Sequence, residues 1–103
     1  MGVTRILETM LGKVVYSKNG RDKGTMFVVV GIVNKRLVLL ADGDLRKIEN
    51  PKIKNIKHVQ LTRMKADDVL AYLSRGEKPD NHIIRKNLKK LQEAAETDGK
   101  EVW

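Results

Sequence analysis

Two strand-like segments joined by a basic loop constrain the fold of this chain more than any other feature. Residues 13–17 alternate between polar and apolar side chains, and residues 27–33 are apolar on both faces. The first pattern predicts a half-covered strand, and the second predicts a strand covered on both sides. The loop between them contains Gly20, Gly24 and three cations. The sequence therefore predicts a hairpin that holds flexible positive charge at the rim of a small β-structure, where it can bind phosphate.

Turn signals divide the following segment into short strands. Asp42 and Gly43 are typical of a tight turn, and Gly31 inside the second strand predicts a bulge or bend. Residues 52–55 have the composition of a basic loop. Three further strands are expected at residues 37–41, 45–49 and 57–61. Five strands this short bury little apolar area as an open sheet, so we expect them to close into a small barrel.

The periodicity of the apolar residues becomes helical after Thr62. Asp67 and Asp68 suit the first turn of one helix, which we expect to end near Gly76. A second helix is expected from an N-cap at Asp80 to residues 98–99. Its apolar stripe comprises Ile84, Leu88, Leu91 and Ala95, and the cations expected to face water are Arg85, Lys86, Lys89 and Lys90. With a short N-terminal helix, the predicted units are residues 1–11, the barrel at 12–62 and a two-helix extension at 63–103.

The excess positive charge lies in the part of the chain predicted to be β. The net charge is +8; residues 1–63 hold 13 Lys+Arg and 5 Asp+Glu, whereas residues 64–103 hold eight of each. One-sided charge is not needed for solubility, so it favours an anionic polymer as the partner. A merely solubilising surface charge is the alternative.

Several classes of protein lack their signatures here. The chain has no cysteine, which excludes disulfides and thiolate metal sites. His58 and His82 have no acidic or cysteine partners at ligand spacing, so we expect no metal site, no cofactor and no enzymatic activity. No apolar run is long enough to cross a bilayer, and no signal peptide is recognisable. We therefore expect a cytoplasmic protein without membrane contact.

The candidate RNA-binding residues form two basic groups. The loop supplies Lys18, Arg21 and Lys23, with Lys13 on the preceding strand; the second group comprises Arg46, Lys47, Lys52, Lys54 and Lys57. Contact with phosphate and plain solvation remain alternatives for each side chain, although affinity grows with the number of phosphates neutralised. Structural turn roles are expected for Gly20, Gly24, Asp42 and Gly43. Asp22 is interpreted as a turn-former whose side chain bonds local N–H groups.

The chain has few aromatic residues, which narrows the mode of recognition. They are Tyr16, Phe27, Tyr72 and Trp103. Methyl-lysine cages, polyproline grooves and base-stacking platforms all need clustered aromatic rings. Recognition of structured RNA through its phosphates is therefore the mode best supported. Tyr16 lies beside the loop, where it can stack on a base or serve as an edge tyrosine of the sheet.

The segments 12–15, 20–24 and 27–30 resemble the KOW motif, in which two strands flank a glycine-containing loop within an SH3-like barrel. The Gly-Arg-x-x-Gly pattern of residues 20–24, the segment 38–43 and the segment 57–59 are similar, in that order, to the large-subunit ribosomal protein of the L-fourteen-e type. Residues 42–46 look like the corresponding segment of small stand-alone bacterial KOW proteins. The resemblance implies a five-stranded SH3-like barrel that binds RNA, and it does not extend to the helices.

These observations converge on a mainly β protein with a helical extension that binds structured RNA without catalysis. The resemblance implies ribosomal RNA or the large ribosomal subunit as the partner. The alternative is a protein-interaction module that docks on a ribosomal or transcription component through the C-terminal helices. The stripe of Ile84, Leu88 and Leu91 distinguishes the two: packing on the barrel weakens the alternative, and exposure strengthens it.

Overall fold

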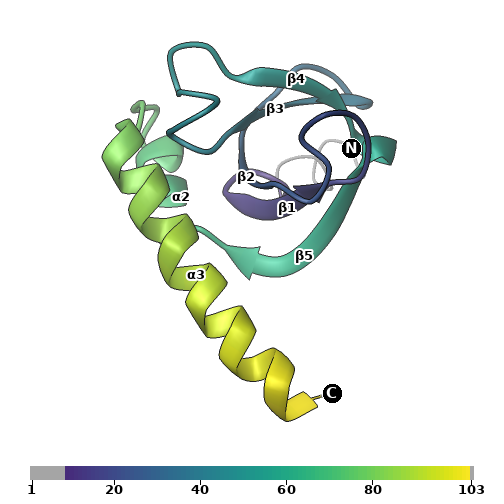
Figure 1. The fold of residues 1–103 in the computed structure, drawn as a ribbon. Coiled ribbons are helices and arrows are strands. Elements are labelled where there is room, and N and C mark those ends of the chain that lie inside the picture. The colour runs from purple at the N-terminus through teal and green to yellow at the C-terminus, as the bar shows by residue number, and fades with distance from the viewer. Residues whose placement is uncertain (1–8, 103) are drawn as a thin grey trace.

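The computed structural model describes the backbone of residues 9–102 and the side chains of residues 9–94. Figure 1 shows strands in the first two thirds of the chain and helices in the last third. The elements are β1 (Lys13–Ser17), β2 (Met26–Ile32), β3 (Leu37–Ala41), β4 (Lys52–Asn55), the 3-10 helix η1 (Ile56–His58), β5 (Val59–Lys65), α2 (Asp67–Ser74) and α3 (Asn81–Val102). Most of the N-terminal helix predicted over residues 1–11 falls outside the described residues, and residues 9–12 form a turn.

The strands form a five-stranded antiparallel sheet in the order β4-β3-β2-β1-β5. Within residues 9–102 no backbone pairing joins the edge strands β4 and β5. The short helix η1 connects them: the Ile56 N–H donates to the Arg36 carbonyl at 2.8 Å, and the Lys18 N–H donates to the His58 carbonyl at 2.9 Å. The sheet is therefore strongly curled, because three residues reach from the β2–β3 turn to the β1–β2 loop.

Strand β2 is covered on both sides, as its two apolar faces predict. Phe27 and Val29 belong to one buried cluster, and Val28 and Val30 belong to another. The register of β2 against β3 shifts between Val29 and Gly31, so the bulge predicted at this glycine is confirmed.

The predicted positions of the last two strands are wrong in part. Residues 45–49 form a loop in which Leu45 is 76% exposed, and the fourth strand is the segment 52–55 that was expected to be a basic loop. The last strand begins at Val59 and continues to Lys65, four residues beyond the predicted end. Strand β4 escaped prediction because its single large apolar residue, Ile53, points outward and is 59% exposed.

The helices begin where their first-turn acids and the Asp80 cap predict. Asp67 and Asp68 lie in the first turn of α2, and the Asp80 carboxylate accepts a hydrogen bond from the Ile83 N–H at 3.0 Å, as an N-cap does. The predicted end of the second helix at residues 98–99 is wrong, because α3 continues through Gly99 to Val102. Neither helix in the described part of the chain has a segment long and apolar enough to span a bilayer.

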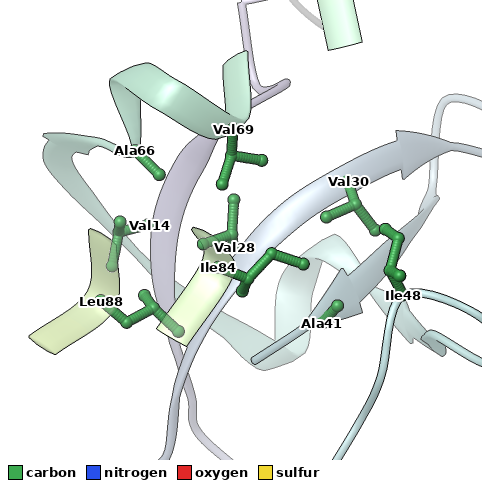
Figure 2. Close-up of a cluster of buried hydrophobic side chains, with 9 residues drawn as sticks. All are labelled: Val14, Val28, Val30, Ala41, Ile48, Ala66, Val69, Ile84 and Leu88. Carbon is green, nitrogen blue, oxygen red and sulfur yellow. The ribbon is translucent and has the colours of Figure 1, made fainter. Parts of the chain in front are cut away.

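The two helices complete the core rather than extending from it. Figure 2 shows Ile84 and Leu88 of α3 and Val69 of α2 packed against Val14 and Val28 of the sheet. Each fully buried aliphatic side chain stabilises the fold by roughly 1.5–3 kcal/mol relative to an exposed one. Among the described residues of the apolar stripe, Ile84, Leu88 and Leu91 therefore pack into the protein's own core, which weakens the alternative of a docking module.

Candidate nucleic-acid interface

The β1–β2 loop is a compact turn closed by backbone hydrogen bonds. The Gly24 N–H donates to the Ser17 carbonyl at 2.8 Å, and the Thr25 N–H donates to the Asp22 carbonyl at 2.9 Å. Gly20 and Gly24 have φ angles of +83° and +86°. Glycine adopts this left-handed region without steric cost, whereas other residues pay roughly 1–2 kcal/mol. The loop is therefore shaped by its two glycines.

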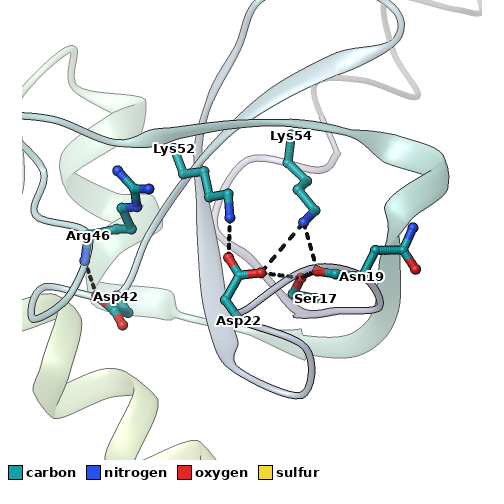
Figure 3. Close-up of polar contacts among 7 residues, drawn as sticks. All are labelled: Ser17, Asn19, Asp22, Asp42, Arg46, Lys52 and Lys54. Atoms are coloured by element: carbon teal, nitrogen blue, oxygen red, sulfur yellow. Dashed lines mark hydrogen bonds and ion pairs between the residues drawn. The ribbon is translucent and has the colours of Figure 1, made fainter.

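Asp22 ties the loop to strand β4. Figure 3 shows its carboxylate between the hydroxyl group of Ser17, at 2.9 Å, and the ammonium groups of two lysines. Lys52 donates a short hydrogen bond to one carboxylate oxygen, and Lys54 lies 3.6 Å from the other. Asp22 lies in a turn, as predicted, but its carboxylate binds the side chains of Ser17 and of a strand thirty residues away rather than the local N–H groups that were expected.

These contacts lower the pKa of Asp22. Partial burial of the carboxylate, whose side chain is 14% exposed, raises the pKa. Hydrogen bonds from Lys52 and Ser17, together with the positive charges of Lys52 and Lys54, outweigh this effect and lower the pKa from 3.8 to about 2. Asp22 is therefore ionised at neutral pH and acts as an internal counter-ion for the two lysines.

The ion pairs divide the predicted RNA-binding lysines into two kinds. The side chain of Lys54 is 10% exposed and also donates to the Asn19 carbonyl at 3.1 Å, while Lys52 is 25% exposed. Both ammonium groups are thus directed inward beneath the loop. In contrast, Lys18, Arg21 and Lys23 are exposed. The acid of the loop faces the protein, and the cations of the loop face the solvent.

Lys57 lies near the loop, and Lys13 does not. Lys57 is exposed on η1, next to His58, whose carbonyl accepts the Lys18 N–H. Lys13 is half-buried at the far end of β1, where it is paired across the sheet with Lys65. The structure therefore brings Lys57 to the loop and separates Lys13 from it.

Arg46 and Lys47 lie on the β3–β4 loop, which emerges at the same end of the sheet as the β1–β2 loop. One Asp42 carboxylate oxygen accepts the N–H groups of Asp44, at 2.9 Å, and Arg46, at 2.8 Å. This pattern wraps the loop around Asp42. Arg46 is half-buried, and Lys47 is exposed.

The β3–β4 loop is fixed to the start of α3. Asn81 accepts the Ile48 N–H at 2.8 Å and donates to the Glu49 carboxylate at 2.9 Å. Gly43, with φ +78°, lies directly against the Asn81 carbonyl. The segment that predicted a tight hairpin turn is therefore a wide loop that docks a helix.

Sequence reasoning left other cations out of the candidate interface. Arg36, exposed in the β2–β3 turn, lies next to η1 because its carbonyl accepts the Ile56 N–H. The four cations of α3 are exposed, as predicted: they are Arg85, Lys86, Lys89 and Lys90. The net charge of residues 64–103 is zero because this range joins a basic segment to acidic ones. A charge count over the whole range therefore concealed the basic segment of α3.

Within the described residues, no group of three or more His, Asp or Glu side chains is arranged to hold a metal ion. The loop end of the sheet carries exposed cations together with hydroxyl groups and backbone N–H groups. Such groups bind oxyanions through charge-assisted hydrogen bonds.

These features define a small basic protein built on a curled antiparallel sheet, with exposed cations on a glycine-shaped loop. The chain is 38% identical over 52 residues to the Bacillus subtilis (strain 168) protein named "Putative ribosome-binding protein YbzG"; the match covers 50% of this chain and 70% of that protein. The chain belongs to the family of that protein. No protein-family model matches the chain.

Proposed function

We propose that this protein binds structured ribosomal RNA on the large ribosomal subunit, without catalysis, and that the β1–β2 loop is its principal contact. The observation that carries the proposal is the division of charge in that loop. Lys18, Arg21 and Lys23 are exposed, whereas the acid of the loop, Asp22, is turned inward onto Lys52 and Lys54. Such a surface presents cations to a polyanion and keeps its carboxylate away from it.

The similarity to the Bacillus subtilis protein supports the ribosome as the partner. The name of that protein describes a ribosome-binding protein, and the alignable part is 70% of its length. A chain with a net charge of +8 is attracted to the phosphates of ribosomal RNA. RNA phosphates rather than a ribosomal protein are therefore the contact that the charge favours.

The fold supports the resemblance to the KOW motif. The antiparallel sheet is curled, and η1 links its edge strands, which supports our proposal of an SH3-like barrel. In this proposal the loop at residues 18–25 corresponds to the KOW loop. Duplex RNA is recognised mainly through shape and backbone contacts, which a loop with exposed lysine and arginine side chains can make.

Salt dependence tests the electrostatic part of the proposal. Four exposed cations, Lys18, Arg21, Lys23 and Lys57, contribute a slope of roughly −0.7 to −0.9 each to log affinity against log salt. From these four contacts alone, affinity for protein-free large-subunit ribosomal RNA should therefore fall at least roughly 50-fold between 50 and 200 mM salt. A filter-binding titration at four salt concentrations measures the slope, and a slope near zero would contradict the proposal.

A double substitution in the loop tests the site. Arg21→Gln with Lys23→Gln should weaken binding to the same RNA about tenfold, because two charge-assisted contacts are lost. Arg63→Gln with Lys65→Gln is the matched control, since it removes an arginine and a lysine at the same spacing from exposed positions of β5. We expect the control to change affinity less than about twofold. Equal losses in the two variants would mean that net charge, and not the loop, determines binding.

A further inference from the structure

The first half of α3 is strongly basic. Residues 81–92 contain four cations and no acid, although residues 64–103 as a whole are neutral. The cations occupy positions 85, 86, 89 and 90. Residues four apart lie on the same side of a helix, so positions 85 and 89 form one pair and positions 86 and 90 form another. Their surroundings therefore decide which of them face a polyanion bound at the β1–β2 loop.

Two of the four cations lie beside acids of α2. Lys90 lines a hollow with Lys65, Asp67 and Asp68, and Lys86 lines a hollow with Asp68 and Arg75. Neither hollow is lined by a residue of the β1–β2 loop. The α2 side of α3 therefore does not continue the surface of that loop.

The other two cations face the candidate interface. Arg85 and Lys89 line a groove of about 360 Å³ between α3, the β1–β2 loop and the β3–β4 loop. The groove is completed by Tyr16, Gly24, Thr25, Met26, Asp42, Asp44, Leu88 and Gln92. It therefore continues the surface of the β1–β2 loop onto the helix.

Two of the charged side chains that line this groove already form hydrogen bonds within the protein. Arg85 donates to the Gly43 carbonyl at 2.5 Å, and Asp42 is engaged with backbone N–H groups of its own loop. Asp44 follows Gly43 in the chain, is exposed and also lines the groove. Farther along α3 the groove is lined by the exposed residues Lys89 and Gln92, and the half-buried Tyr16 of β1 completes its lining.

We propose that this groove is a second RNA contact, which holds a segment of the same RNA that the β1–β2 loop binds. Lys89 contacts a backbone phosphate, and Tyr16 packs against the ribose or base of the adjoining nucleotide. The Asp44 carboxylate accepts a hydrogen bond from a ribose hydroxyl group at the other end, where a phosphate would be repelled. The proposal rests on the function proposed above and assigns the basic face of α3 a role within it.

Two neighbouring lysines of one helix provide the test. Lys89→Gln and Lys90→Gln remove the same charge from exposed positions of α3, and glutamine and lysine have similar helix propensities. Affinity for protein-free large-subunit ribosomal RNA is measured at two or more salt concentrations, with the wild type and the Arg21→Gln, Lys23→Gln variant alongside. Thermal melts establish that both single variants are folded.

If the groove binds RNA, Lys89→Gln should weaken binding about three- to tenfold and reduce the salt slope by about 0.7–0.9. Lys90→Gln should change affinity less than twofold. Equal effects of the two substitutions, with the loop variant still impaired, would overturn the groove and leave the proposed function in place. An effect of Lys89→Gln on intact ribosomal subunits but not on protein-free RNA would identify a protein as the occupant and overturn the RNA assignment. No binding by the wild type would overturn both proposals.

Discussion

Gly43→Ala should destabilise the protein by roughly 2–5 kcal/mol, and Gly24→Ala should cost about 1–2 kcal/mol. Both glycines have positive φ angles, +78° and +86°, so both substitutions incur the same backbone strain. A Cβ atom at Gly43 would also overlap the Asn81 carbonyl and lie 3.1 Å from the Arg85 side chain, whereas nothing lies within 4 Å of one at Gly24. The difference between the two losses in free energy of unfolding therefore measures the cost of the steric overlap where α3 closely approaches the β3–β4 loop.

Urea unfolding followed by circular dichroism gives both free energies. If Gly43→Ala leaves no folded protein, the melting temperature of Gly24→Ala still provides the reference for backbone strain alone. Equal losses of stability in the two variants would show that α3 does not press on Gly43 in solution.

Asp22→Asn should lower the free energy of unfolding by about 2 kcal/mol at neutral pH. The wild-type carboxylate has a folded-state pKa of about 2, below the 3.8 of an unperturbed aspartate. A lowered folded-state pKa stabilises the protein above pH 3.8, and this stabilisation is lost as the pH falls toward 2. The advantage of the wild type over Asp22→Asn should therefore be constant from pH 7 to about pH 5 and shrink as the pH approaches 2.

Urea titrations at several pH values between 2.5 and 7 measure this advantage. Asp44→Asn removes one negative charge from an exposed side chain and controls for the change in net charge. The interpretation of Asp22 as an internal counter-ion would be abandoned if the gap between wild type and Asp22→Asn were independent of pH.

The strands with regular apolar patterns could be predicted from the sequence. Residues 13–17 and 37–41 form strands with the predicted bounds, because local alternation and burial agree there. At β4 the alternation of residue types and the burial of the side chains disagree, because Ile53 is exposed while Lys52 and Lys54 are directed toward the β1–β2 loop. A pattern with one outward-facing apolar residue gives no hydrophobic signal, whereas Leu45 and Ile48 gave a false one on the β3–β4 loop.

The sequence predicted which charged residues form the candidate site but not how they are arranged in space. Glycines and cations at residues 18–24 indicated a basic loop, and the structure shows these cations exposed. The pairing of Asp22 with Lys52 and Lys54 depends on the curl of the sheet, which no local pattern encodes. The groove beside Lys89 likewise depends on the packing of α3 against the loop end of the sheet.

The packing of Ile84 and Leu88 onto the sheet has a consequence for biosynthesis. Both residues follow the last strand of the sheet in the sequence, yet they share a core cluster with Val14 and Val28. A chain emerges from its N-terminus during translation, so the nascent sheet keeps one bare apolar face until α3 has also left the ribosome. We therefore expect the sheet to acquire its native structure only after α3 has been synthesised, in a single cooperative step.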